Sequence, residues 1–152
     1  MIKNILLFVF IIAGTVANAQ NKNVIYVTLQ PVDLGIGLRY DRHFSDVGIY
    51  ATLTRGNYRL RDSYINNHIR VSAGSLIVFN KNTPANKESI VSCGIVYHHY
   101  GERCYDPKII NEKIFRPISI ELGVGANVNR FNVGIRIDIL KAEGNADFGV
   151  SF

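Results

Sequence analysis

The C-terminal segment, residues 130–152, alternates apolar and polar side chains at every second position. Its first half carries the apolar residues Phe131, Val133, Ile135, Ile137 and Ile139, separated by polar or small residues. After the turn-rich sequence KAEGN, the alternation resumes with Phe148, Val150 and Phe152. Because successive side chains of a strand point to opposite faces, this period predicts a β-hairpin with one apolar face.

The rest of the chain repeats this period, and no helical period interrupts it. Eight strands are predicted, at residues 24–30, 34–44, 48–55, 69–79, 90–100, 118–128, 131–139 and 147–152. The choice of face is weak for the first strand, and the register is less certain for the strand at 69–79, where Leu76 and Val78 share the side of Arg70 and Ser72. Short turns at 45–46 and 129–130, a connection at 80–88 and two polar loops at 56–67 and 101–113 join the strands. Short hairpin connections favour an all-β, closed, antiparallel up-and-down barrel of eight strands.

The N-terminus has the features of a signal peptide, with Lys3 before an apolar run at residues 5–13. Ala17-Asn18-Ala19 follows as a small-x-small cleavage pattern, so residues 1–19 are expected to be removed and residues 20–152 to form the barrel domain. An uncleaved membrane anchor is the alternative. The formal net charge of +5 comes without a basic run, so nucleic-acid binding is not expected.

The two faces of the predicted strands indicate whether the outside of the barrel contacts lipid or water. One face is nearly continuous Ile, Leu, Val and Ala, which suits lipid, whereas a soluble barrel would bury that face and expose the polar one. Glycines collect on the polar face, at Gly35, Gly37, Gly48, Gly74, Gly94, Gly123, Gly125, Gly134 and Gly149. The narrow interior of an eight-stranded barrel needs such small residues beside large ones, although strand glycines can also mark bulges. The pattern therefore predicts a transmembrane barrel.

Charged residues fall on the same inward face. They are Arg39, Asp41, Glu121, Arg136 and Asp138. An Arg or Lys facing lipid at the bilayer midplane costs about 2–4 kcal/mol, so these charges are expected to point inward and pair with one another. Such a lumen charge network would close the barrel to ions.

The lengths of the connections predict the topology. If the N-terminus starts in the periplasm, loops 56–67 and 101–113 lie outside the cell and the short turns lie in the periplasm, the asymmetry typical of such barrels. Four phenylalanines then reach the periplasmic ends of strands and form an aromatic girdle. They are Phe44, Phe79, Phe131 and Phe152. Aromatic side chains favour this membrane interface.

Over the whole mature chain, this pattern resembles the small OmpX/OmpA-type outer-membrane β-barrels. In those families the last strand, with alternating apolar residues and a terminal Phe, is the signal read by the barrel-assembly machinery, and Phe148, Val150 and Phe152 match it. The resemblance implies the outer membrane of a Gram-negative bacterium, with its lipid and lipopolysaccharide as partners. Members serve as adhesion, defence or structural proteins, and some are enzymes.

The sequence His98-His99-Tyr100 is the main candidate for chemistry, as a metal site or the base of an acyl hydrolase. Adjacent strand residues point to opposite faces, so His98 and His99 do not readily share one ligand sphere. The His-x-Ser arrangement of lipid A-modifying barrels is missing, and the protease candidates Asp62, His68, His98 and Asp106 have no convincing spacing. No catalytic, cofactor or metal site is therefore predicted, and polar residues at the membrane rim are the simpler interpretation.

The loops carry arginines that suit lipopolysaccharide phosphates, namely Arg55, Arg59, Arg61 and Arg103, with Arg70 and Lys108 nearby. A solvated loop surface explains them equally well. Tyrosines at positions 58, 64, 100 and 105 could contact a further partner. Cys93 and Cys104 could form a disulfide in an exported protein, or stay apart, one in a strand and one in a loop.

These observations predict a structural or surface-interaction protein that acts through loops 56–67 and 101–113. Two alternatives stay open. A lipid-modifying enzyme would use His98 or His99 at the rim. A soluble periplasmic ligand-binding barrel would be recovered without detergent.

Overall fold

The computed structural model describes residues 22–31, 34–60, 63–79, 87–100, 103–104 and 117–152, with the backbone alone at 58–60, 63–66 and 103–104. The predicted signal peptide, residues 1–19, lies outside these ranges. The described elements are strands, namely β1 (Lys22–Gln30), β2 (Gly35–Phe44), β3 (Val47–Leu60), β4 (Ser63–Phe79), β5 (Lys87–His99), β6 (Arg103–Cys104), β7 (Ile118–Val128), β8 (Phe131–Asp138) and β9 (Glu143–Ser151). In this part of the chain, no helix has the length and apolar character needed to cross a membrane.

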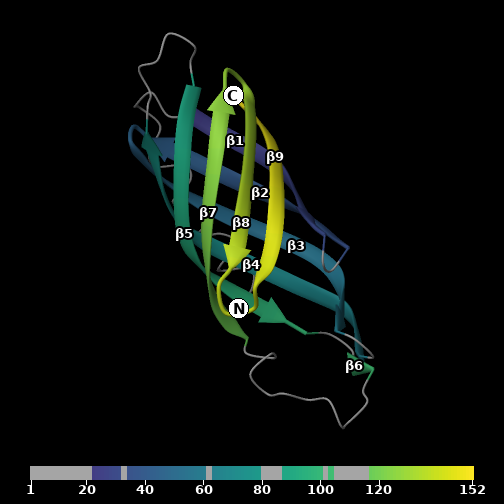
Figure 1. The fold of residues 1–152 in the computed structure, drawn as a ribbon. Coiled ribbons are helices and arrows are strands. Elements are labelled where there is room, and N and C mark those ends of the chain that lie inside the picture. The colour runs from purple at the N-terminus through teal and green to yellow at the C-terminus, as the bar shows by residue number, and fades with distance from the viewer. Residues whose placement is uncertain (1–21, 32–33, 61–62, 80–86, 101–102, 105–116) are drawn as a thin grey trace, which may run out of the picture.

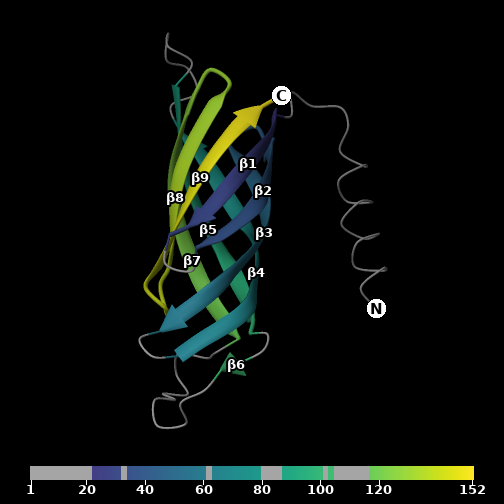
Figure 2. The ribbon, with the colours of Figure 1, turned by 90° about the vertical axis from the view of Figure 1, so that its right-hand side faces the viewer.

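Eight of these strands close into a barrel. Each pairs antiparallel with its neighbour in the sequence, β5 pairs with β7, and β1 pairs with β9 to close the ring (Figure 1, Figure 2). At this seam Asn23 and Phe152 exchange backbone hydrogen bonds of 3.1 and 2.9 Å. The predicted all-β, closed, eight-stranded antiparallel barrel is confirmed.

The barrel places apolar side chains outside and polar ones inside. Ile36, Leu38 and Ile95 are each more than 60% exposed, whereas Thr28, Asp41 and Glu121 are fully buried. The first strand follows the rule, with Val24 and Tyr26 inward and Ile25 and Val27 outward. Since lipid is the solvent that suits such an exterior, the barrel is a transmembrane one.

The two ends of the barrel differ. The end that carries the turns at Ser45–Asp46 and Asn129–Arg130 is called the turn end, and its turns place Ser45 and Asn129 at φ of 70° and 60°. The opposite end is called the loop end, and β6 lies there, away from the C-terminus, in both views (Figure 1, Figure 2). At the turn end, Phe44 and Phe79 end strands, Phe131 begins one, and Phe152 follows the last residue of β9.

The expected loop at 56–67 is wrong, because β3 and β4 continue through it. After a register shift between Gly56 and Tyr58, the two strands pair as far as Leu60 and Ser63, and β6 adds to β4 at residues 64 and 65. Beyond the membrane a ribbon needs no apolar face, so its alternation is less visible in the sequence, while its Tyr, Ile and Leu residues still favour strand. Of the other expected loop, 101–113, only β6 is described.

The last hairpin turns earlier than predicted. Its turn occupies residues 139–142, with Ala142 at a φ of 55°, and β9 already begins at Glu143. Glu143 and Asn145 are buried in the barrel interior. Their polar side chains resemble a turn in the sequence, although they continue the inward face of the strand.

Candidate functional site in the barrel lumen

The middle of the lumen holds three arginines and three carboxylates in contact. We call this set, Arg39, Asp41, Arg70, Glu121, Arg136 and Asp147, the lumen network. Each member is at most 5% exposed, and the formal charges cancel. Buried charges are tolerated when they are paired and hydrogen-bonded. Each member of this set has an oppositely charged partner, although Nε and Nη1 of Arg70 donate no hydrogen bond within the described residues.

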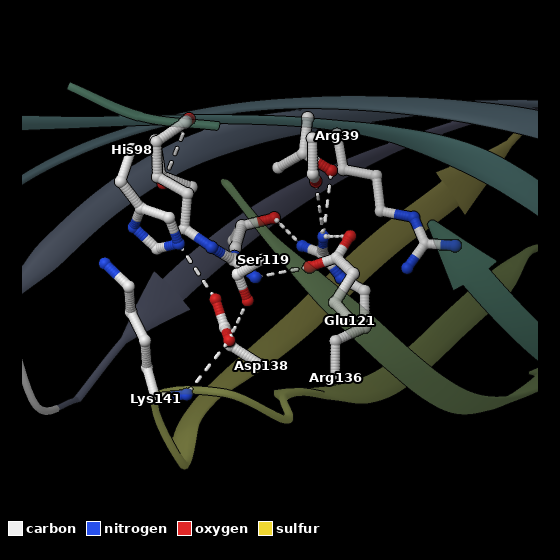
Figure 3. Close-up of polar contacts among 12 residues, drawn as sticks. Arg39, His98, Ser119, Glu121, Arg136, Asp138 and Lys141 are labelled. Carbon is white, nitrogen blue, oxygen red and sulfur yellow. Dashed lines mark hydrogen bonds and ion pairs between the residues drawn. The ribbon is translucent and has the colours of Figure 1, made fainter. Parts of the chain in front are cut away.

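Arg136, on β8, is central to the network (Figure 3). Its Nε and Nη2 donate to the two carboxylate oxygens of Asp147, at 2.7 and 2.8 Å, in the bidentate geometry that gives strong ion pairs. Its Nη1 donates to Glu121 at 2.9 Å and to the Thr52 hydroxyl at 3.0 Å. The guanidinium thus joins β9 and β7 to β3 on the opposite wall.

Arg39, on β2, forms the second half of the network. Its Nε and Nη2 donate to Asp41 at 2.5 and 2.8 Å, and its Nη1 donates to Asp147 at 2.9 Å. The guanidinium also lies over the rings of Tyr26 and Tyr50, at 5.0 and 4.6 Å from their centroids. Asp147 therefore accepts from two arginines at once, and aromatic rings cover the cations.

Glu121 links the network to a third arginine. It accepts a hydrogen bond from Tyr50 at 2.9 Å and a further, short one from Nη2 of Arg70. Small residues make room for these groups: an added Cβ at Gly123 would lie 2.5 Å from Cγ of Arg136. Towards the turn end, Tyr50 also packs with Leu76, Val78 and Ile90 in a buried apolar cluster. Polar and apolar side chains thus fill successive levels of the lumen.

A second polar cluster lies at the loop end, around Asp138 at the end of β8 (Figure 3). Its Oδ2 is 2.8 Å from Nε2 of His98, and its Oδ1 accepts from the Ser119 hydroxyl and, at 3.2 Å, from the backbone N–H of Lys141. Nδ1 of His98 lies 3.0 Å from Nε2 of His68. Asp138 is thus held by three groups.

The structure brings four of the five predicted lumen charges into one network and places Asp138 in the second cluster. Sequence reasoning missed Asp147 and Arg70 as network members. The period of two places both on the inward face, and we expected Arg70 among the lipopolysaccharide contacts. That expectation is wrong for Arg70, which is 1% exposed and paired with Glu121.

The rim interpretation of His98 is also wrong, since its side chain is buried in the lumen while that of His99 is exposed. Arg55 is exposed and donates to Asn67 at 2.5 Å. The side chains of Arg59, Arg61 and Arg103 lie outside the described set. Cys93 is a free, exposed thiol on β5, so it forms no disulfide with Cys104.

Comparison with solved structures identifies the fold. The chain superposes on the Yersinia pestis outer-membrane protein Ail, determined in a phospholipid bilayer nanodisc, with a TM-score of 0.55 and 15% sequence identity, over 87% of this chain and 97% of Ail. The chain has the fold of a small outer-membrane β-barrel. The resemblance to the OmpX/OmpA-type barrels is thereby confirmed for the fold.

Another similar structure is the Neisserial surface protein NspA, with a TM-score of 0.43 and 11% identity over 86% of this chain and 91% of NspA. No protein family and no curated protein matches the sequence. The superposition on Ail establishes the small outer-membrane barrel as a fold, and residue roles are argued from the geometry of the lumen and the barrel ends.

Proposed function

We propose that this protein is a closed barrel of the Gram-negative outer membrane, with a structural or surface-interaction role at its loop end rather than a pore. The observation that carries the proposal is the lumen network, in which Arg136 contacts residues from β3, β7 and β9 at one level of the barrel. An ion passing this level would have to separate paired, dehydrated charges. Breaking one buried pair costs about 3–5 kcal/mol, which supports a closed lumen.

Reconstitution into planar lipid bilayers tests the closed lumen. Folded protein is expected to give no stable large conductance, whereas an open porin reconstituted at the same protein-to-lipid ratio gives steps. Folding is checked by faster migration of the unboiled sample on a gel. Stable channels from correctly folded protein would contradict the proposal.

Cell fractionation tests the location. We expect the mature protein in the outer-membrane fraction, extractable only with detergent, and beginning at Gln20 after signal-peptide cleavage. The exposed apolar exterior supports this expectation. Recovery in the periplasm without detergent would instead favour the soluble ligand-binding barrel.

The loop end is the part of the barrel that would meet lipopolysaccharide and other cells. Arg55 supports this role, because its exposed guanidinium is held by Asn67 near the start of the ribbon that β3 and β4 form. Arg55→Ala is expected to weaken binding of purified lipopolysaccharide to barrels in micelles. Arg130→Ala, which removes an exposed arginine at the turn end, is the matched control. Equal binding by both variants and the parent would argue against this contact.

The proposed role is not enzymatic. A serine hydrolase needs its histidine between the serine and the acid, whereas here Asp138 lies between Ser119 and His98. Mass spectrometry of lipid A incubated with folded protein is expected to show no loss or transfer of acyl chains. Acyl transfer or hydrolysis that His98→Ala or His99→Ala abolishes would establish the lipid-modifying alternative.

A further inference from the structure

Three side chains of metal-ligand type meet at the loop end of the lumen, each from a different strand. They are His98 at the end of β5, Asp138 at the end of β8 and Glu143 at the start of β9. One ligand atom of each lies within 4.8 Å of the others. The three residues are only 1%, 0% and 4% exposed, so they form a site within the barrel.

Neighbouring groups orient two of these ligands. Asp138 receives hydrogen bonds from Ser119 and the backbone of Lys141 on Oδ1, so that Oδ2 is directed towards His98. The other ring nitrogen of His98 is 3.0 Å from His68. Metal-binding histidines usually have such a partner on the second nitrogen, which fixes the ring orientation and the tautomer. The cluster therefore has oriented ligands and a supporting layer behind them.

The donor chemistry of the cluster suits a divalent transition-metal ion. One imidazole nitrogen and two carboxylate oxygens form a set that binds zinc, with ligand distances of about 2.0–2.2 Å and an open fourth position for water. Asp138 and Glu143 bring two carboxylates close together in a buried place, where a cation between them removes their repulsion. The nearby ammonium of Lys141 lies over the ring of Tyr100, 4.4 Å from its centroid.

We propose that His98 Nε2 and one carboxylate oxygen each of Asp138 and Glu143 bind a divalent transition-metal ion, with zinc as the expected occupant. The ion would join β5 to the β8–β9 hairpin at the loop end of the lumen. His68 acts as a positioning residue through His98. The proposal goes beyond the closed barrel and does not depend on the surface role of the protein.

Calorimetric titration of zinc chloride into untagged, chelator-stripped protein folded in detergent micelles tests the proposal. The parent is expected to bind one ion per chain. His98→Gln and Glu143→Gln are each expected to weaken binding by about 100-fold or more, and His68→Gln by roughly 10–100-fold, as for other outer-shell partners. His99→Gln changes the neighbouring histidine, whose side chain is exposed on the outer face, and is expected to bind as the parent does.

A second measurement separates loss of zinc binding from loss of folding, because a urea midpoint is obtained only from a variant that folds. Zinc is expected to raise the urea midpoint for unfolding of the parent and of His99→Gln, because a ligand that binds the folded state stabilises that state. The midpoint of Glu143→Gln is expected to stay unchanged, because this variant lacks one of the three ligands. Absence of saturable binding to the folded parent would overturn the proposal. So would unchanged affinity in Glu143→Gln, or a loss in His99→Gln as large as that in His98→Gln.

Discussion

Arg136 binds Asp147 through two guanidinium hydrogen bonds, of 2.7 and 2.8 Å, between the adjacent strands β8 and β9. Both side chains are buried, and Asp147 also accepts from Arg39. Asp147 thus lies at the centre of the lumen network, and removing its charge leaves the guanidinium groups of both Arg39 and Arg136 without that acceptor. The network should therefore contribute to stability mainly through the cost of leaving a buried charge unpaired.

Asp147→Asn is expected to lower the free energy of unfolding by about 3–5 kcal/mol, because two buried arginines lose a charged acceptor. Urea titration of barrels in lipid vesicles measures the change. The control is Glu88→Gln, which makes the same kind of replacement in a pair with Lys22 of similar length, 2.8 Å, but with both side chains partly exposed. That pair should contribute about 1 kcal/mol or less, and equal losses in the two variants would contradict the argument.

Tight packing around Tyr50 gives a second prediction. An added Cβ at Gly94 would lie 2.2 Å from the Tyr50 hydroxyl oxygen and 2.5 Å from the carbonyl oxygen of Ala73. Gly94→Ala should displace Tyr50 from Glu121 and destabilise the barrel by about 1–3 kcal/mol in the same urea titration. Gly144→Ala is the matched control, because no heavy atom lies within 4 Å of its added Cβ. A neutral Gly94→Ala would mean that the lumen has more room than the contacts imply.

The outward face gives a third prediction, which separates a membrane barrel from a soluble one. Ile135 is 55% exposed and pairs with Val124 near the middle of β7, so Ile135→Arg places a charge in the lipid and should cost about 2–4 kcal/mol. Ile139→Arg, in the turn after β8, should cost about 0–1 kcal/mol. Unfolding from vesicles measures both. Equal, small effects would fit an aqueous exterior.

The fold was predictable because the two faces of a membrane-barrel strand have different surroundings, lipid outside and a polar lumen inside. Side chains therefore alternate between apolar and polar along the sequence. This rule placed Arg39, Asp41 and Arg136 inward correctly. It fails where polarity has another cause: Glu143 and Asn145 read as a turn although they face the lumen. The extension of β3 and β4 beyond the membrane was missed because it contacts no lipid, so its sequence does not need the apolar and polar alternation.

The contacts within the lumen were less predictable than its composition. Arg136 reaches Thr52 on the opposite wall, and His98 meets Asp138 across a strand that separates them in the sheet order. Which inward residues share a level depends on the tilt and stagger of all eight strands, and no single strand carries that information. The sequence therefore predicted the inward charges but neither their partners nor the cluster of His98 with Glu143.

The C-terminal Phe152 allows a test of the proposed assembly signal. Phe152→Ala keeps the backbone hydrogen bonds to Asn23 that close the barrel seam, so the stability of the inserted barrel should change little. The yield of inserted protein in cells should nevertheless fall several-fold, because the aromatic end of the last strand is lost. Phe131→Ala is the matched control, since this residue is similarly exposed, at 73% against 70%, and also lies at the turn end. Equal yields of the two variants, measured as heat-modifiable protein in outer-membrane fractions, would leave Phe152 with the interface role alone.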